Sequence, residues 1–329
     1  MLPNRALCIL FWKENIKMAI NKYMKAALKA ISYADINYKI ERDVKELTGK
    51  NPMNDLRIDL ERTVKINGEK AVPVVIYYPL TVTSNEVILF FHGGGWVSGT
   101  VESYARTCDL LGEMTGRRVV SVEYALAPEH PFPYAVEECY GVAKKLILGK
   151  SLFEAKPSDI ILAGDSAGGN IAAAVSLMAR DRGEFRINRQ ILIYPAVNND
   201  HTENSQFESV RTNGTDYLLT SKRLCEYLDM YASDPLDKYN PYFAPYIAKD
   251  LSDQPDTLII TAEFDPLRDE GEAYGEKLKE FGNYAEVHRI HDALHGFFSL
   301  PFRYSHVRQA YKIINEFLKT TQKGAADER

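Results

Sequence analysis

The pentapeptide Gly164-Asp165-Ser166-Ala167-Gly168 constrains the fold of this chain more than any other segment. It directly follows the apolar run 160–163, and the stretch 170–180 after it reads as a helix. Because glycine has no Cβ, a strand can turn sharply into a helix here and leave Ser166 exposed at the apex. The pattern therefore predicts a strand, a tight elbow and a helix that present a nucleophile. The alternative is that Ser166 is an ordinary helix N-cap, a position that serine favours.

A serine nucleophile needs a general base and a group that orients this base. Asp265 comes just after the buried strand-like run 257–262, and His295 lies in the loop that follows the run 285–290. Open α/β sheets place their sites at the carboxyl ends of strands. We therefore expect Ser166, Asp265 and His295 to meet at one end of a sheet.

Both partners have rivals in the sequence. Glu263 and Asp269 compete with Asp265, but we expect Glu263 to lie in the strand end and Asp269 to begin the next helix. His295 could be a structural histidine, although Gly296 gives it room. The chain order of serine, acid and histidine favours Asp265 and His295.

Donors for an oxyanion are predicted at two places. The strand-like run 87–91 ends in His92-Gly93-Gly94-Gly95-Trp96. A glycine loop suits this role because a side chain would obstruct the approach of the backbone to a substrate. Ala167 is expected to donate its N–H because it directly follows the nucleophile. We interpret His92 as a structural residue that braces the glycine loop.

Four motifs follow one another along the chain: His92-Gly93-Gly94-Gly95-Trp96, Leu126-Ala127-Pro128-Glu129-His130-Pro131-Phe132-Pro133, Gly164-Asp165-Ser166-Ala167-Gly168-Gly169, and Asp265-Pro266-Leu267-Arg268-Asp269-Glu270 with His295-Gly296-Phe297. In these motifs, from about Val72 to Phe298, the chain resembles the hormone-sensitive-lipase-like esterases of the α/β-hydrolase fold. The resemblance implies that Gly94 and Gly95 donate to the oxyanion, and that a homodimer is one form to expect. The family usually has an arginine where Ala125 stands, which concerns local packing.

Strand-like runs alternate with helical stretches through most of the chain. The runs 58–66 and 72–78 form a predicted hairpin around Asn67-Gly68, a strong turn signal. Further strands are expected to begin near residues 87, 119, 160, 191, 258 and 285, and the last helix to span about 305–319. This alternation predicts an α/β fold with a mostly parallel eight-stranded sheet, helices on both faces and a helical cap.

The predicted organisation is one catalytic domain with a cap. We assign 51–320 to the catalytic domain, with a cap insertion at about 198–250, and 1–50 to an N-terminal cap segment. Residues 321–329 read as a flexible tail. The segment Ile16–Ile31 has the pattern of an amphipathic helix with lysines on its polar face. We expect it to pack as a lid helix; contact with a membrane surface is the alternative, since such a helix can lie on anionic lipid.

Charge and cysteine content exclude several classes of function. A net charge of −5 and a pI of about 5.9 give no electrostatic case for nucleic acid. We expect free thiols in a reducing compartment because the four cysteines are scattered without CxxC spacing; they are Cys8, Cys108, Cys139 and Cys225. No run approaches the roughly 18 apolar residues of a membrane span, and no signal peptide is evident, so the predicted location is the cytoplasm.

No metal or organic cofactor is predicted. His288, His291 and His295 are close in sequence, but strand positions three apart point to opposite faces, which argues against a shared metal. The predicted function is therefore a serine carboxylesterase acting through an acyl-enzyme on small-molecule esters. An amidase or deacetylase with the same triad is the alternative, and a non-catalytic ligand-binding protein of this fold is a further one.

Four aromatic residues are candidates either for an acyl pocket or for the core. They are Trp96, Phe207, Tyr217 and Tyr227. The cap segment 198–216 is polar, and a long acyl chain needs a continuous apolar groove. We therefore expect short- to medium-chain acyl esters to be preferred.

Overall fold

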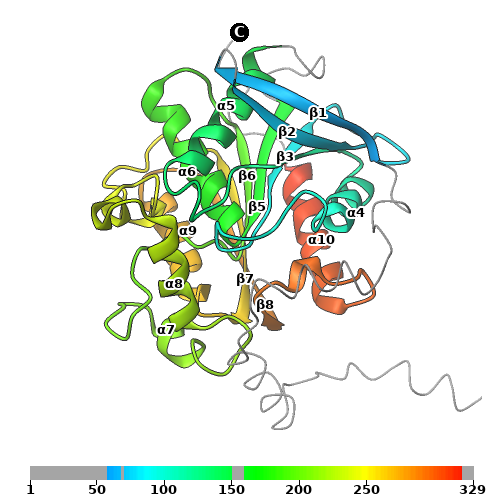
Figure 1. Ribbon diagram of the computed structural model, residues 1–329. Coiled ribbons are helices and arrows are strands. Elements are labelled where there is room, and N and C mark those ends of the chain that lie inside the picture. Colours follow the sequence, from blue (N-terminus) through cyan, green and yellow to red (C-terminus); the bar gives the residue numbers. More distant parts are fainter. Residues whose placement is uncertain (1–57, 68–69, 150–158, 321–329) are drawn as a thin grey trace, which may run out of the picture.

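The predicted α/β fold with a central sheet is confirmed. The computed structural model describes residues 58–67, 70–149 and 159–320 (Figure 1). Its sheet has eight strands in the order β1-β2-β4-β3-β5-β6-β7-β8. The strands are β1 (Ile58–Asn67), β2 (Lys70–Tyr77), β3 (Val87–Phe91), β4 (Arg118–Val122), β5 (Ile160–Asp165), β6 (Arg189–Ile193), β7 (Asp256–Phe264) and β8 (Ala285–Leu294). The β1–β2 and β2–β4 pairs are antiparallel, and the other pairs are parallel.

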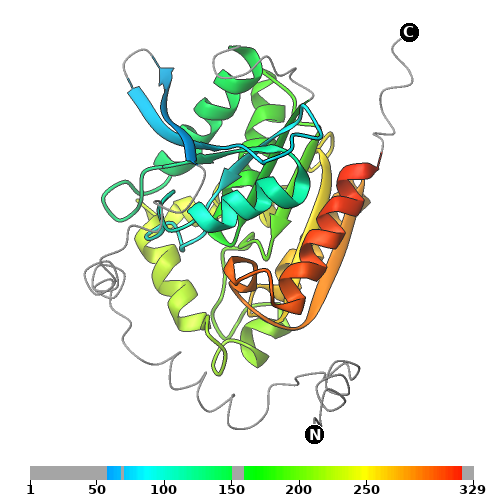
Figure 2. The same ribbon diagram turned by 90° about the vertical axis from the view of Figure 1, so that its right-hand side faces the viewer.

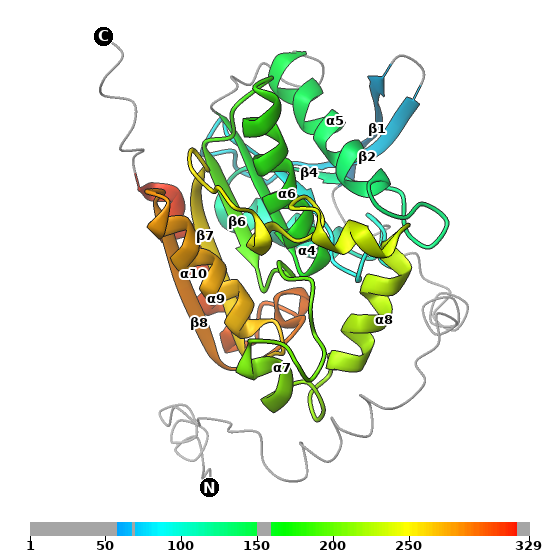
Figure 3. The ribbon, with the colours of Figure 1, turned by 90° about the vertical axis from the view of Figure 1, so that its left-hand side faces the viewer.

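Helices cover both faces of the sheet. They are α4 (Ala105–Thr115), α5 (Tyr134–Leu148), α6 (Ala167–Arg182), α7 (Glu208–Thr212), α8 (Ser221–Tyr231), α9 (Arg268–Glu280) and α10 (Ser305–Lys319), with short 3₁₀ helices η3 (Pro235–Tyr239), η4 (Pro245–Ile247) and η5 (Phe297–Ser299). Helices α5, α6 and α9 lie on one face, and α4 and α10 on the other (Figures 1 and 3). Figure 2 shows α10 beside the edge strand β8.

The central strand β3 is apolar along its whole length because both of its faces are buried. In β3, Val87, Leu89 and Phe91 face one core cluster, whereas Ile88 and Phe90 face the other. All five side chains are fully buried. This uninterrupted run is typical of a parallel sheet between two helical layers.

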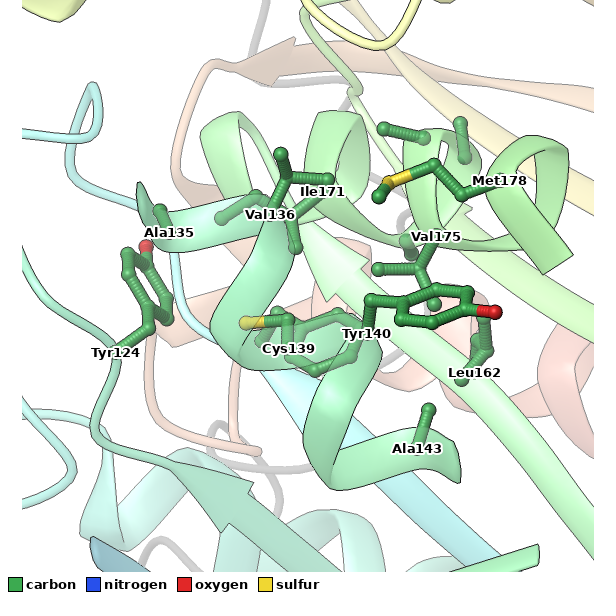
Figure 4. Close-up of a cluster of buried hydrophobic side chains, with 14 of the residues drawn as sticks. Tyr124, Ala135, Val136, Cys139, Tyr140, Ala143, Leu162, Ile171, Val175 and Met178 are labelled. Carbon is green, nitrogen blue, oxygen red and sulfur yellow. The ribbon is translucent and has the colours of Figure 1, made fainter. Parts of the chain in front are cut away.

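Helix α6 fixes the region around Ser166 to the core. Figure 4 shows Val136 and Cys139 of α5 close to Ile171 and Val175 of α6, with Leu162 of β5 beneath them. Each such side chain contributes roughly 1.5–3 kcal/mol when it is fully buried. The packing of α6 against α5 and β5 therefore holds the start of α6 in a fixed position.

Helices α7 and α8 with η3 and η4 occupy the segment between β6 and β7, within the predicted cap insertion at 198–250. They lie at the end of the sheet toward which the parallel strands point (Figure 3). The root of this insertion is tied to α9 by a pair with both side chains fully buried, in which His201 Nε2 lies 2.6 Å from Glu270 Oε2. Glu270 Oε1 also accepts the N–H groups of Val197 and Asn198, at 2.8 and 3.1 Å.

Several predictions concern residues outside the described ranges. They are the N-terminal cap segment 1–50 with the helix Ile16–Ile31, the tail 321–329, and Cys8. Three of the four predicted free thiols, Cys108, Cys139 and Cys225, are confirmed. No helix within the described ranges is long and apolar enough to cross a membrane.

Ala125 occupies the position at which the sequence departs from the family pattern. Its N–H donates to Glu138 Oε2 at 2.7 Å, and Glu138 Oε1 lies 2.8 Å from Lys70 Nζ. The carboxylate of Glu138, which is 6% exposed, is thus supplied with both a backbone donor and a cation without an arginine at position 125.

Candidate active site

The turn between β5 and α6 holds Ser166 in a rare backbone conformation. Its φ is +55° and its ψ is −118°, a region that side chains with a Cβ avoid. A Cβ on Gly168 would lie 2.0 Å from the carbonyl oxygen of Phe91, so only glycine allows this close approach of the first turn of α6 to the end of β3. Although Ser166 stands at the N-cap position of α6, its hydroxyl makes no capping hydrogen bond. The hydroxyl is therefore directed away from the helix.

Three candidate residues from three strand ends are brought together. The Oγ of Ser166 lies 2.9 Å from Nε2 of His295, and Nδ1 of His295 lies 2.7 Å from Oδ2 of Asp265. Asp265 is fully buried, and its Oδ1 accepts the N–H of Leu267 at 2.9 Å. The side chain of His295 is 13% exposed. This is the geometry of a nucleophile, a base and an orienting carboxylate.

The loop that carries Asp265 is held by cap helix α7. Asn213 Nδ2 donates to the carbonyl oxygens of Glu263 and Asp265, at 3.1 and 3.2 Å. Ser209 Oγ donates to the carbonyl oxygen of Pro266 at 2.8 Å. Ser209 and Asn213 are buried, so these bonds form in a medium where they are strong. The cap therefore fixes the position of the acid as well as covering the strand ends.

The two rival acids have other partners. Glu263 lies in β7 as predicted, and its Oε2 accepts the N–H of Asp292 at 2.7 Å. Asp269 lies in the first turn of α9 as predicted, and its Oδ2 accepts the N–H of Ser209 at 2.7 Å. Neither carboxylate has a hydrogen bond with His295 among the described residues.

The strand before His295 is longer than predicted. The sequence indicated 285–290, whereas β8 continues to Leu294 through an irregularity in its pairing with β7. Asp292 at this bulge has a φ of +58°, and the N–H that it donates to Glu263 helps to hold it there. The polar residues in the bulge interrupt the apolar pattern, so the sequence does not indicate that the strand continues. The bulge bends the strand and directs His295 toward the elbow.

The glycine loop after β3 has a backbone that other residues rarely adopt. Gly94 and Gly95 have φ values of +124° and +62°. A Cβ on Gly95 would lie 2.5 Å from the ring of Tyr227, so the loop and the cap helix α8 are in direct contact. Among the described residues, the N–H groups of Gly94, Gly95 and Ala167 have no acceptor. They are free to bind an anionic oxygen.

His92 lies behind the glycine loop and is fully buried. Its ring stacks on that of Tyr124 with centroids 4.3 Å apart, and its Nδ1 lies 2.8 Å from the carbonyl oxygen of Gly93. Burial lowers the pKa of His92 to about 4. A neutral imidazole that binds the loop's own backbone fits the predicted bracing role.

Asp165 was not singled out as a candidate in the sequence. Its carboxylate accepts the N–H of Gly93 at 2.9 Å, the hydroxyl of Tyr104 at 2.9 Å and the hydroxyl of Tyr194 at 3.3 Å. Burial raises the pKa of Asp165 to about 6. A charged residue directly before Ser166, at the end of an otherwise apolar strand, is the signal that could have identified it.

The four aromatic candidates have different environments. Trp96 is 1% exposed and stacks on Tyr231 with centroids 4.6 Å apart, so the structure favours the core alternative for it. Phe207 and Tyr217 are also buried, each with 7% exposure. Tyr227 is partly buried and lies against Gly95. Of the four, Tyr227 is the one that contacts the glycine loop.

The histidines near the end of the chain do not gather into a cluster. His288 Nε2 lies 3.1 Å from Glu286, and His291 Nδ1 lies 3.4 Å from Glu263. Within the described ranges, no group of three or more histidine, cysteine, aspartate or glutamate side chains could hold a metal ion.

Known proteins resemble this chain over most of its length. A family model described as the alpha/beta hydrolase fold matches residues 88–299. An arylesterase of Saccharolobus solfataricus is 33% identical over 270 residues, which cover 82% of this chain and 85% of that protein. The carboxylesterase NlhH of Mycobacterium tuberculosis is 34% identical over 244 residues, which cover 74% of this chain and 76% of that one.

Among solved structures, a hyperthermophilic esterase from the archaeon Pyrobaculum calidifontis matches with a TM-score of 0.78 and 36% sequence identity. The match covers 92% of this chain and 98% of that one. These likenesses confirm the family that the four motifs indicated. The chain belongs to the hormone-sensitive-lipase-like branch of the α/β-hydrolase fold, a family of carboxylic ester hydrolases.

Proposed function

We propose that this protein is a serine carboxylesterase in which Ser166, His295 and Asp265 form the catalytic triad. The observation that carries the proposal is the pair of contacts through His295, 2.9 Å to Ser166 and 2.7 Å to Asp265. His295 takes the proton of Ser166 as the hydroxyl attacks the ester carbonyl, and it then gives this proton to the leaving alcohol. Water hydrolyses the resulting acyl-enzyme with His295 again as base.

The N–H groups of Gly94, Gly95 and Ala167 bind the oxyanion that forms in both steps. Their lack of an acceptor among the described residues supports this role. One such donor is worth about 3 kcal/mol in the transition state. The chemistry that we propose uses no metal and no organic cofactor.

The proposed substrates are esters of short- to medium-chain acids. The polar segment 198–216 offers no continuous apolar groove for a long chain. Tyr227 beside Gly95 adds apolar surface close to the oxyanion site, where the first carbons of an acyl chain would lie.

The test is turnover of p-nitrophenyl esters from acetyl to palmitoyl, together with the anilide that matches the best ester. We expect kcat/KM to be highest between about two and eight carbons, and the anilide to be turned over far more slowly. Turnover of the anilide at the rate of the ester would favour the amidase alternative. Binding without turnover would favour a ligand-binding protein, and a steady rise beyond about ten carbons would contradict the short pocket.

A further inference from the structure

Asp165 connects the glycine loop to the nucleophile elbow. Its Oδ1 accepts the N–H of Gly93, which directly precedes the proposed oxyanion donors. Asp165 also directly precedes Ser166 in the chain. A Cβ on Gly93 would lie 2.9 Å from Oδ2 of Asp165, so the loop is packed against this carboxylate. The distance between the oxyanion donors and the nucleophile therefore depends on Asp165.

Tyr194 connects the same carboxylate to the base. Its hydroxyl lies 3.3 Å from Oδ2 of Asp165, and its ring lies against the His295 ring with centroids 4.7 Å apart. Tyr194 is fully buried and has a φ of +35°, a strained value for a tyrosine. Strain of this kind persists only where surrounding contacts enforce it. Tyr194 thus lies between Asp165 and His295 and contacts both side chains.

The charge of Asp165 has few partners. The groups that face it are the hydroxyls of Tyr104 and Tyr194, the N–H of Gly93 and the imidazole of His295, with the thiol of Cys108 and the phenol of Tyr124 farther away. Within the described ranges no lysine or arginine forms an ion pair with it. The nearby cation that can form during the reaction is therefore the imidazolium of His295, which also has Asp265 on its Nδ1.

We propose that Asp165 is a positioning residue of the esterase: its carboxylate holds the oxyanion loop against the elbow, and its negative charge favours the imidazolium of His295. The inference rests on the proposed function, because it assigns His295 as the base. Two substitutions separate the two effects. Asp165→Asn keeps an acceptor for Gly93 and removes the charge, whereas Asp165→Ala removes both.

The experiment measures kcat and KM of both variants for p-nitrophenyl butyrate across pH 4.5–9. For Asp165→Asn we expect the acid limb of kcat/KM to move down by about half a pH unit, since a nearby anion favours the charged imidazole. Its plateau kcat should fall no more than about tenfold. For Asp165→Ala we expect a fall in kcat of about a hundredfold with little change in KM, since misplaced oxyanion donors act on the transition state.

Glu138→Gln is the matched control, because Glu138 is a buried carboxylate that also accepts a backbone N–H but contacts none of the triad. It should leave both the acid limb and kcat unchanged. An acid limb that stays in place in Asp165→Asn overturns the inference, as does a kcat of Asp165→Ala equal to that of wild type. If Asp165→Ala does not fold, Asp165→Asn decides alone. Ser166→Ala distinguishes the two failures: an active Ser166→Ala sinks the proposed function itself.

Discussion

The nucleophile elbow and the acid loop are held in place by different parts of the molecule. The elbow is fixed inside the body, where Gly168 touches the end of β3 and Asp165 binds Gly93. The loop of Asp265 is fixed from outside, through hydrogen bonds from Ser209 and Asn213 of the cap. In the proposed mechanism, the body therefore holds the attacking oxygen of Ser166, and the cap fixes the loop of Asp265, which orients His295.

This difference separates two kinds of substitution. A change at the elbow should act on the bond-forming step itself, because the reacting atom is placed there. A change in α7 should leave Ser166 in place and act through Asp265, so its effect on rate should be smaller. Experiments on the two regions can confirm or break this distinction.

The largest effect is expected at the elbow. Ser166→Ala should lower kcat for p-nitrophenyl butyrate by at least about 10⁴-fold with the fold intact, because no acyl-enzyme can form. Stopped assays measure kcat, and thermal unfolding followed by circular dichroism shows whether the fold is intact. Ser176→Ala changes a buried serine within α6, the helix that Ser166 precedes, and it should retain wild-type turnover. Retention of a tenth of the wild-type rate by Ser166→Ala would show that another residue is the nucleophile.

A second effect concerns stability at the elbow. The folded pKa of Asp165 is about 6 because of burial, against 3.8 for an exposed aspartate. A raised pKa means that this group favours the fold at low pH and that the benefit is lost as pH rises through about 6. A shift of this size corresponds to about 3 kcal/mol.

Asp165→Asn lacks this titration, so its free energy of unfolding relative to wild type should improve by about 2–3 kcal/mol between pH 4 and pH 8. Urea unfolding at the two pH values measures the difference. Ser176→Ala, which removes no charge, should differ from wild type by the same amount at both. A pH-independent difference for Asp165→Asn would contradict the buried-charge account.

A smaller effect is expected from the cap. Asn213→Ala removes both bonds to the acid loop and should lower kcat by about tenfold, the effect of losing about 1.4 kcal/mol of transition-state stabilisation. Asn283→Ala is the control, since Asn283 also donates to two backbone carbonyls but lies before β8, at the opposite end of that strand from His295. Equal losses of kcat in the two variants would mean that α7 has no specific effect on the acid.

The smallest effect tests the contact between cap and glycine loop. Tyr227→Ala should lower kcat/KM for butyrate and hexanoate esters by about threefold to tenfold and leave acetate nearly unchanged, because a longer chain loses more apolar contact. Tyr239→Ala removes an exposed cap tyrosine and should change none of these values. A uniform loss across all three esters would remove Tyr227 from the acyl pocket.

The body of the molecule could be predicted from its sequence because its signals are local. Apolar runs such as 87–91 and 160–163 stand directly before the glycines that turn the chain, so strand, elbow and candidate nucleophile are visible in one short window. The chain order then restricts the acid and the base. The same reasoning placed Glu263 in a strand and Asp269 in a helix, as the structure has them.

The contacts of the cap could not be predicted in this way. Asn213 reaches Glu263 across 50 residues of sequence, and no local pattern marks a side chain that binds backbone carbonyls so far along the chain. Trp96 adjoins the glycine loop in sequence, yet its ring packs into the core against Tyr231. The bulge at Asp292 was missed because its stabilising partner, Glu263, lies on the neighbouring strand.

The buried pair of His201 and Glu270 has a consequence for recombination between related enzymes. Glu270 belongs to the helix after the acid loop, whereas His201, Val197 and Asn198 belong to the root of the cap insertion. A chimera with a single crossover between His201 and Glu270 would take these two residues from different parents, and a buried carboxylate without its partner is strongly destabilising. An exchange bounded by one crossover after Asn213 and a second before β7 keeps His201 with Glu270 and keeps Ser209 and Asn213 with the loop of Asp265, and it replaces α8 and the surface around Tyr227. Such an exchange would transfer the acyl preference of one enzyme to another, while all residues of the proposed triad come from one parent.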